Sequence, residues 1–149
     1  MFNKILVPLD GSKTAECCLV HVVDIAKGCN VPEVILLFVA EPVSAGLYQA
    51  SADVREKLWD WSKTYLAGVT KGLATYGVTA KSVTIEGKPA ESIVDYAEKN
   101  GIDLIVMSTH GRSGPSRWAL GSVSDKVIRS SRVAVLICVP EGCRIGSSS

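Results

Sequence analysis

The sequence predicts a single doubly wound α/β domain. Short apolar runs, typical of buried strands, alternate along the chain with segments in which apolar residues recur at helical spacing. The length of 149 residues suits one domain with a single core. No internal repeat or linker composition interrupts the alternation. These observations together favour a parallel sheet with helices on both faces.

The first half of the chain predicts two strands and two helices. Residues 2–10 are apolar up to the turn at Asp10-Gly11-Ser12, and residues 33–42 form a continuous apolar run, as in a strand covered on both faces. Ser12 is a suitable N-cap for a helix whose buried face would hold Ala15, Cys18, Leu19, Val22 and Ala26. A second helix, closing near Gly77, would bury the stripe Val54, Leu58, Trp61, Tyr65 and Val69. Since residues two apart cannot share a helix face, we expect Trp61 in the core and Trp59 at the surface or an interface.

The second half continues the pattern. Residues 79–87 alternate in polarity, as in an edge strand, and Pro89 is well placed in the first turn of a third helix that ends near Gly101. Residues 103–108 predict the fourth strand, 123–130 the fourth helix and 132–140 the fifth strand. Strands that alternate with helices in this way are joined by right-handed crossovers into a parallel sheet.

Composition excludes several classes of protein. The net charge of +1 supplies no field for a general nucleic-acid or membrane binder. No apolar stretch approaches the roughly 18 residues of a transmembrane helix, and the N-terminus lacks the features of a signal peptide, so we expect a cytoplasmic protein. The five cysteines form no C-x-x-C pair and have no ligand-like spacing to His21 or His110, so no protein metal site is expected. Residues 142–149 predict a flexible C-terminal tail or a cloning remnant behind a domain of residues 1–141.

The segment STHGRSGPSRWALGS, residues 108–122, holds the main candidate site. In open α/β sheets, ligands bind beyond the carboxyl ends of the strands, where the strand order reverses. Gly111 and Gly121 permit close backbone approach, the free N–H groups of a helix follow Gly121, and Arg112 and Arg117 could add charge-assisted contacts to an anion. The segment is not a Walker A loop, and the loop after the first strand lacks the G-x-G-x-x-G motif, so an ordinary long turn remains the alternative.

His110 could act as a general base only with an orienting acid or a nearby nucleophile, and the sequence offers no clear partner beyond Asp10 or Ser108. The alternative is a structural role for His110 within the loop. We therefore predict no catalytic residue.

Four segments in this order resemble the universal stress protein family over nearly the whole chain: KILVPLDGS, LLFVAEP, GKPAESIVDYAEKNGIDLIVMSTHGRSG and LGSVSDKVIRSS. The ATP-binding branch of that family has the motif G-2x-G-9x-G-[ST]. Gly111, Gly121 and Ser122 match it, whereas Ser108 stands where the motif has its first glycine. The resemblance implies a Rossmann-like, adenine nucleotide alpha hydrolase-like sheet with the strand order 3-2-1-4-5.

The resemblance also implies roles for residues. It places Pro8, Leu9 and Asp10 on the adenosine side, the backbone of Val39 at the adenine edge, and Met107 and Ser108 beside the ribose. The phosphates, with Mg or Mn bridging them, would be held by Gly111, Gly121, Ser122, Val123 and Ser124. Arg112, which could add charge-assisted contacts to the phosphates, is the last residue of the predicted nucleotide site. A homodimer is implied through the last strand, which begins at Val133 and ends at Val139.

The predicted function is that of a dimeric, ATP-binding stress-response or signalling module whose nucleotide state modulates its partners. Two alternatives stay open: a dimeric scaffold that binds no nucleotide, for which Ser108 is the argument, and a slow ATP hydrolase or adenylyl-type transferase. Because the loops match neither the S-G-G-x-D-S nor the H-x-G-H pattern of related transferases, we expect at most weak ATPase activity.

Overall fold

The computed structural model describes residues 1–42, 52–109 and 121–139. Its centre is a five-stranded parallel sheet in the order β3-β2-β1-β4-β5, as predicted. The strands are β1 (Lys4–Pro8), β2 (Glu33–Ala40), β3 (Ala80–Glu86), β4 (Leu104–Ser108) and β5 (Ala134–Cys138). The strand order reverses at β1, because β2 and β4 lie on its two sides, and this is the position where doubly wound sheets bind ligands.

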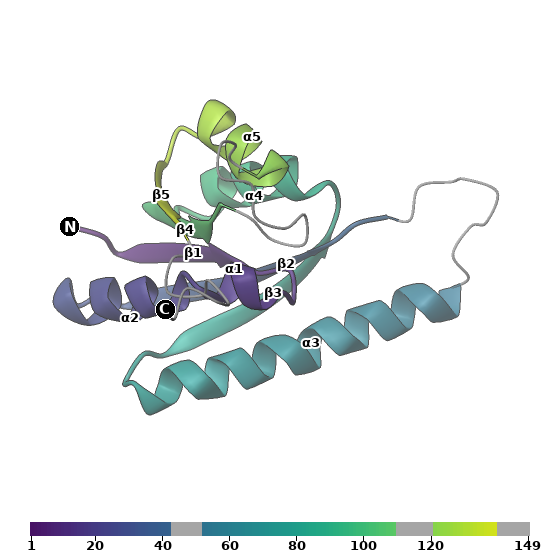
Figure 1. Cartoon of the computed structure of the whole chain (residues 1–149), viewed down its shortest axis with the longest axis horizontal. Coiled ribbons are helices and arrows are strands. Elements are labelled where there is room, and N and C mark those ends of the chain that lie inside the picture. Colours follow the sequence, from purple (N-terminus) through teal and green to yellow (C-terminus); the bar gives the residue numbers. More distant parts are fainter. Residues whose placement is uncertain (43–51, 110–120, 140–149) are drawn as a thin grey trace, which may run out of the picture.

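Helices cover both faces of the sheet (Figure 1). On one face lie α1 (Lys13–Glu16), α2 (Leu19–Gly28) and α3 (Ala52–Thr75), packed on a core that includes Val7, Val22 and Phe38. On the other lie α4 (Pro89–Lys99) and α5 (Ser122–Ser130), packed on a second core that includes Leu6 and Ile105. Alternate residues of β1 thus enter different cores, as expected for a strand buried on both faces.

The predicted signals at the ends of the helices are present. Ser12 caps α1 with its hydroxyl, which accepts a hydrogen bond of 3.1 Å from the Ala15 N–H. Pro89 occupies the first turn of α4, and Gly101 follows the C-cap of that helix with a φ of +65°.

Two local predictions are wrong. The first predicted helix is two helices, because the backbone tightens at Cys17, whose N–H donates to the Thr14 carbonyl, three residues back. Trp61 is 48% exposed and Val54 is 52% exposed, so neither is a core residue. The buried positions of α3 are instead Ser62, Leu66 and Leu73.

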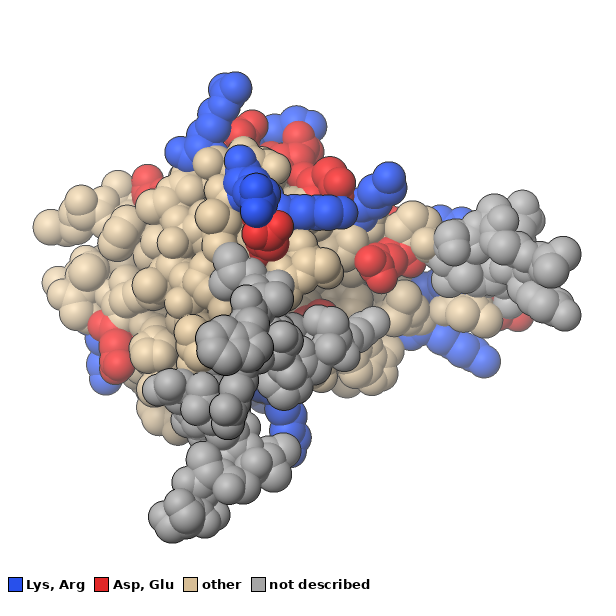
Figure 2. Space-filling model, turned by 45° about the horizontal axis from the view of Figure 1, so that its top comes forward, with Lys and Arg blue, Asp and Glu red and all other residues tan. Residues whose placement is uncertain are grey.

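Charged side chains of both signs are interspersed on the face that Figure 2 shows. Among the described residues, charged side chains also form ion pairs, such as the two contacts of 2.7 and 2.9 Å between the Arg55 guanidinium and the Glu86 carboxylate. At physiological salt, mixed charges of this kind largely cancel beyond a Debye length. No helix within the described ranges is long and apolar enough to cross a membrane.

Candidate nucleotide site

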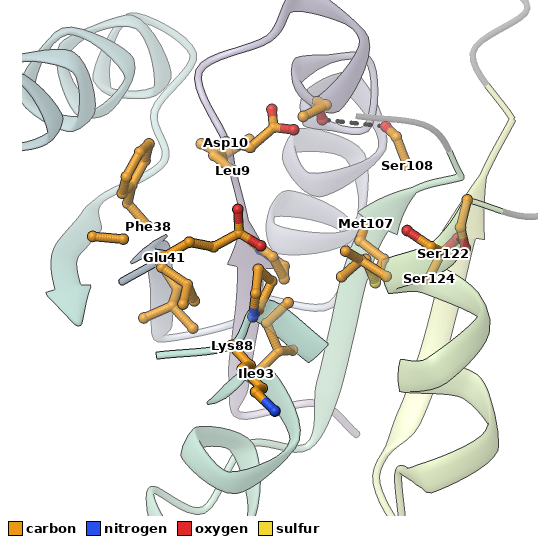
Figure 3. Close-up of a pocket in the computed structure, with 18 of the residues that line it drawn as sticks. Leu9, Asp10, Phe38, Glu41, Lys88, Ile93, Met107, Ser108, Ser122 and Ser124 are labelled. Carbon is orange, nitrogen blue, oxygen red and sulfur yellow. Dashed lines mark hydrogen bonds between the residues drawn. The ribbon is translucent and has the colours of Figure 1, made fainter. Parts of the chain in front are cut away.

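A cavity of about 960 Å³ lies beyond the carboxyl ends of β1, β2 and β4. Figure 3 shows how the side chains around it converge from separate elements. Every predicted site residue that the structure describes lines this cavity: Pro8, Leu9, Asp10, Val39, Met107, Ser108, Gly121, Ser122, Val123 and Ser124. Two others, Gly111 and Arg112, lie outside the described residues, as do His110, Arg117 and Trp118. Segments far apart in the sequence therefore meet in one place.

One side of the cavity is the turn after β1, residues 10–12, which we call the β1 wall. One carboxylate oxygen of Asp10, Oδ1, accepts hydrogen bonds from the Ser12 N–H at 2.9 Å and the Ser12 hydroxyl at 2.6 Å. The same hydroxyl caps α1. Gly11, between these residues, has a φ of +88°, a conformation that L-residues with a side chain rarely adopt. The Asp10 carboxylate is thus held by a turn whose conformation at Gly11 favours glycine.

The opposite side is the junction of β4 and α5, comprising Thr109 and residues 121–124, which we call the α5 wall. The Gly121 N–H donates to the Thr109 carbonyl at 2.8 Å, and the Ser124 hydroxyl is within 2.9 Å of the same carbonyl. A Cβ on Gly121 would overlap the Thr109 carbonyl oxygen. Glycine is required here by this close approach, since its φ of −59° is open to any residue.

Ser108, where the motif has glycine, lies between the two walls. Its side chain is 6% exposed, and its hydroxyl donates to the Ala15 carbonyl of α1 at 3.2 Å, the dashed line in Figure 3. The extra hydroxyl is therefore paired with the protein and ties β4 to the helix that follows the β1 wall.

The predicted set omitted several residues that also line the cavity: Ala15, Leu37, Phe38, Ala40, Glu41, Pro42, Leu58, Lys88, Pro89, Ile93 and Thr109. Most are apolar and resemble core residues in sequence, so no local signal distinguishes them. Glu41 and Lys88, which Figure 3 places on the side away from Ser108, follow the ends of β2 and β3. The rule that ligands bind at the carboxyl ends of strands could have nominated both.

The described residues contain no group of three or more His, Cys, Asp or Glu side chains that could hold a metal ion. The oxygen atoms of side chains that line the cavity belong to the hydroxyls of Ser108, Thr109, Ser122 and Ser124 and to the Asp10 and Glu41 carboxylates. A divalent cation in such a site would depend on ligand oxygens for part of its coordination.

The fold and the cavity define a doubly wound α/β domain with a cavity at the reversal of strand order, the position where such sheets bind ligands. The sequence profile of the universal stress protein family matches residues 1–139. The chain belongs to this family.

Individual relatives agree. The chain is 34% identical to the universal stress protein MJ0577 of Methanocaldococcus jannaschii, over 92% of this chain and 94% of the relative. It is 32% identical to a universal stress protein of Bacillus subtilis, over 92% and 99% of the two chains. The solved structure of MJ0577 superposes with a TM-score of 0.83, at 35% identity over 93% and 96% of the chains.

Two more distant structures contain nucleotides. A universal stress protein in complex with cAMP has a TM-score of 0.70 at 21% identity, over 93% of this chain and 98% of the other. A family protein from Arabidopsis thaliana with AMP bound has a TM-score of 0.69 at 16% identity, over 98% and 97%. At identities of 21% and 16%, these two comparisons show a shared fold and no more.

Proposed function

We propose that this cavity binds an adenine nucleotide, ATP in particular, and that the protein is a dimeric, cytoplasmic stress-response module whose nucleotide state modulates its partners. The observation that carries the proposal is the convergence of Asp10, Val39 and Gly121-Ser122, which are far apart in sequence, around one cavity. The volume of this cavity falls in the range of small-molecule sites. Two family members with cAMP and AMP bound support the adenine nucleotide as the class of ligand.

The nucleoside would lie between the ends of β1, β2 and β4. Pro8, Leu9 and the Val39 backbone would face the base, and the Asp10 carboxylate would accept a hydrogen bond from a ribose hydroxyl or from the base. Hydrogen bonds to ionised acceptors are the stronger ones, so Asp10 would contribute most among these contacts. Met107, which is 6% exposed, would pack against the ribose.

The phosphates would lie at the start of α5. The first N–H groups of this helix have no partners within it, and the helix dipole favours an anion there. Ser122 is exposed at this end, whereas Ser124 is 1% exposed and bonded to Thr109 and Gly121. We therefore assign phosphate binding to the Ser122 hydroxyl and the backbone of residues 121–124, together with Gly111 and Arg112 and with Mg or Mn bridging the phosphates.

The alternative of a scaffold that binds no nucleotide depended on Ser108. Because the Ser108 hydroxyl is paired with Ala15, it does not need to be desolvated by a ligand. We assign no catalytic residue and expect at most weak ATPase activity.

Isothermal titration calorimetry with ATP, ADP, AMP and cAMP, each with and without Mg²⁺, tests the proposal directly. We expect saturable heat with ATP and a higher melting temperature in its presence, because a ligand that binds only the folded state stabilises it. Absence of both heat and thermal shift at millimolar ATP would overturn the assignment.

The dimer is proposed through β5, one of the two edge strands of the described sheet, which is flanked by Val133 and Val139. Leu136 is 37% exposed and Val139 58% exposed, and an apolar edge strand is prone to pair with another chain. Light scattering should give a dimer for the wild type and a monomer for Leu136→Lys. Val54→Lys, at an apolar residue exposed on α3, is the control and should stay dimeric. A monomeric wild type, or a dimeric Leu136→Lys, would contradict this interface.

A further inference from the structure

We propose that Trp61 is a positioning residue for nucleotide binding: through Gly11, it holds the β1 wall in the place where Asp10 meets the nucleoside. This inference rests on the proposed function. No motif assigns Trp61 a role, and its spacing on α3 predicted only a core residue. The structure instead places its indole on the backbone of the turn that carries Asp10.

The contact is made by the six-membered ring of the indole. A Cβ on Gly11 would stand 2.5 Å from Cη2 of Trp61, 3.2 Å from Cζ3 and 3.6 Å from Cζ2. The ring therefore lies where a Cβ of Gly11 would project, and a side chain at this position would require the indole or the turn to shift. Two features therefore favour glycine at position 11: the nearby indole of Trp61 and the φ of +88°.

The position of Trp61 is itself fixed by two aromatic neighbours. Its ring stacks on Tyr65, one turn along α3, with centroids 5.3 Å apart and an interplanar angle of 4°. It meets Phe38 of β2 edge to face, with centroids 5.9 Å apart at 69°. Aromatic pairs in these geometries add to stability beyond the area that they bury. Since Phe38 also lines the cavity, Trp61 links that lining to the β1 wall.

Hydrogen bonds within the β1 wall fix its shape, and just before the turn the Leu9 N–H donates to the Leu37 carbonyl of β2 at 2.9 Å. The bonds among Asp10, Ser12 and Ala15 all lie within the turn and the first turn of α1. The Ser108 bond to Ala15 ties the far end of this unit to β4. On the side of the turn that faces α3, the indole of Trp61 supplies the contact with Gly11. Without the indole, we expect the turn to shift as a unit, carrying the Asp10 carboxylate with it.

Trp59 provides a matched control on the same helix. It is two residues from Trp61, and its ring lies beneath the Lys63 ammonium, 5.9 Å from the ring centroid. The same substitution at the two positions thus removes the same side chain from α3, but only one of the two contacts Gly11.

The experiment is a double-mutant cycle on nucleotide affinity, measured by calorimetry with AMP and ATP for Trp61→Leu, Asp10→Asn and the double variant. We expect Trp61→Leu to bind about tenfold more weakly, as when one charge-assisted hydrogen bond is lost. The double variant should be no weaker than Asp10→Asn alone, because Trp61 acts through that carboxylate. Trp61→Phe keeps a ring on Tyr65 but not the part that reaches Gly11, and should match Trp61→Leu.

Unchanged affinity in Trp61→Leu, a loss of the same size in Trp59→Leu, or losses that add to that of Asp10→Asn would each overturn the inference.

Hydrogen exchange in the ligand-free protein distinguishes a failure of the positioning role of Trp61 from a failure of the proposed function. Trp61→Leu should accelerate exchange of the Ser12 and Ala15 N–H groups several-fold while that of Ile105 in β4 stays unchanged. Equal acceleration at all three, or none, would refute the positioning role even if the wild type binds nucleotide; a wild type without affinity would refute the proposed function alone.

Discussion

The two walls of the cavity are held in different ways. The β1 wall is a turn whose shape comes from side-chain hydrogen bonds of Asp10 and Ser12, with an aromatic ring of α3 laid over Gly11. The α5 wall is a close approach of two backbones, at which Gly121 lies against the Thr109 carbonyl. The first wall should therefore depend on side-chain chemistry and support, whereas the second should depend on the absence of any added atom.

The largest effect is expected for Gly121→Ala, which breaks the α5 wall. The new Cβ would overlap the Thr109 carbonyl oxygen, so the free energy of unfolding should fall by about 2–3 kcal/mol, as for other overpacked sites. Nucleotide affinity should fall with it, because the start of α5 must move. Urea denaturation and calorimetry measure the two effects.

Gly68→Ala is the matched control for that substitution. Gly68 lies in α3 and has nothing within 4 Å of the position of a Cβ, so alanine should raise the free energy of unfolding, by up to about 1 kcal/mol. If Gly121→Ala were as stable as the wild type, the close approach would not be the reason for glycine at this position.

A smaller effect is expected for Ser108→Gly, which removes the bond that ties β4 to α1, the helix that follows the β1 wall. The Ala15 carbonyl loses a buried donor and a strand gains a glycine, so we expect a loss of about 1–2 kcal/mol in the free energy of unfolding. Affinity for ATP should change by no more than about twofold, because the hydroxyl is already paired within the protein. A large gain in affinity on restoring the glycine would show instead that Ser108 obstructs the ligand.

The sequence predicted the elements well because hydrophobic period and turn residues are local signals, whereas the strand order came from the resemblance to the universal stress protein family. Pro89 and Gly101 mark the ends of α4 in the sequence and in the structure. The convergence of Asp10 and Gly121 also followed, because the carboxyl ends of neighbouring parallel strands share one edge of the sheet.

Prediction failed where the outcome depended on how far the sheet extends beneath a helix. The 24 residues of α3 span about 36 Å, whereas the eight residues of β2, the longest strand, span about 26 Å. Figure 1 shows α3 extending past the sheet, which leaves Val54 without a surface to pack on. The spacing of apolar residues identifies one face of a helix but not the surface against which that face packs. The contact of Trp61 with Gly11, 50 positions away by number, likewise has no local signal.

The smallest effect on stability is expected within the α5 wall itself, where two serines should divide structure from binding. Ser122 is exposed, so Ser122→Ala should change the free energy of unfolding by less than about 0.5 kcal/mol, as at other surface sites. Its affinity for ATP should nevertheless fall several-fold, because a donor to the phosphates is lost. Affinity for adenosine, which has no phosphates, should not change.

Ser124→Ala should show the opposite pattern, with a loss of about 1 kcal/mol in stability, because its buried hydroxyl bonds Thr109 and Gly121. Ser82→Ala, at an exposed serine of β3 outside the cavity, controls for the substitution and should change neither property. If Ser122→Ala bound ATP as tightly as Ser82→Ala does, the Ser122 hydroxyl would not contact the phosphates. The α5 wall would then bind through its backbone geometry, the property that Gly121 secures, and not through its side chains.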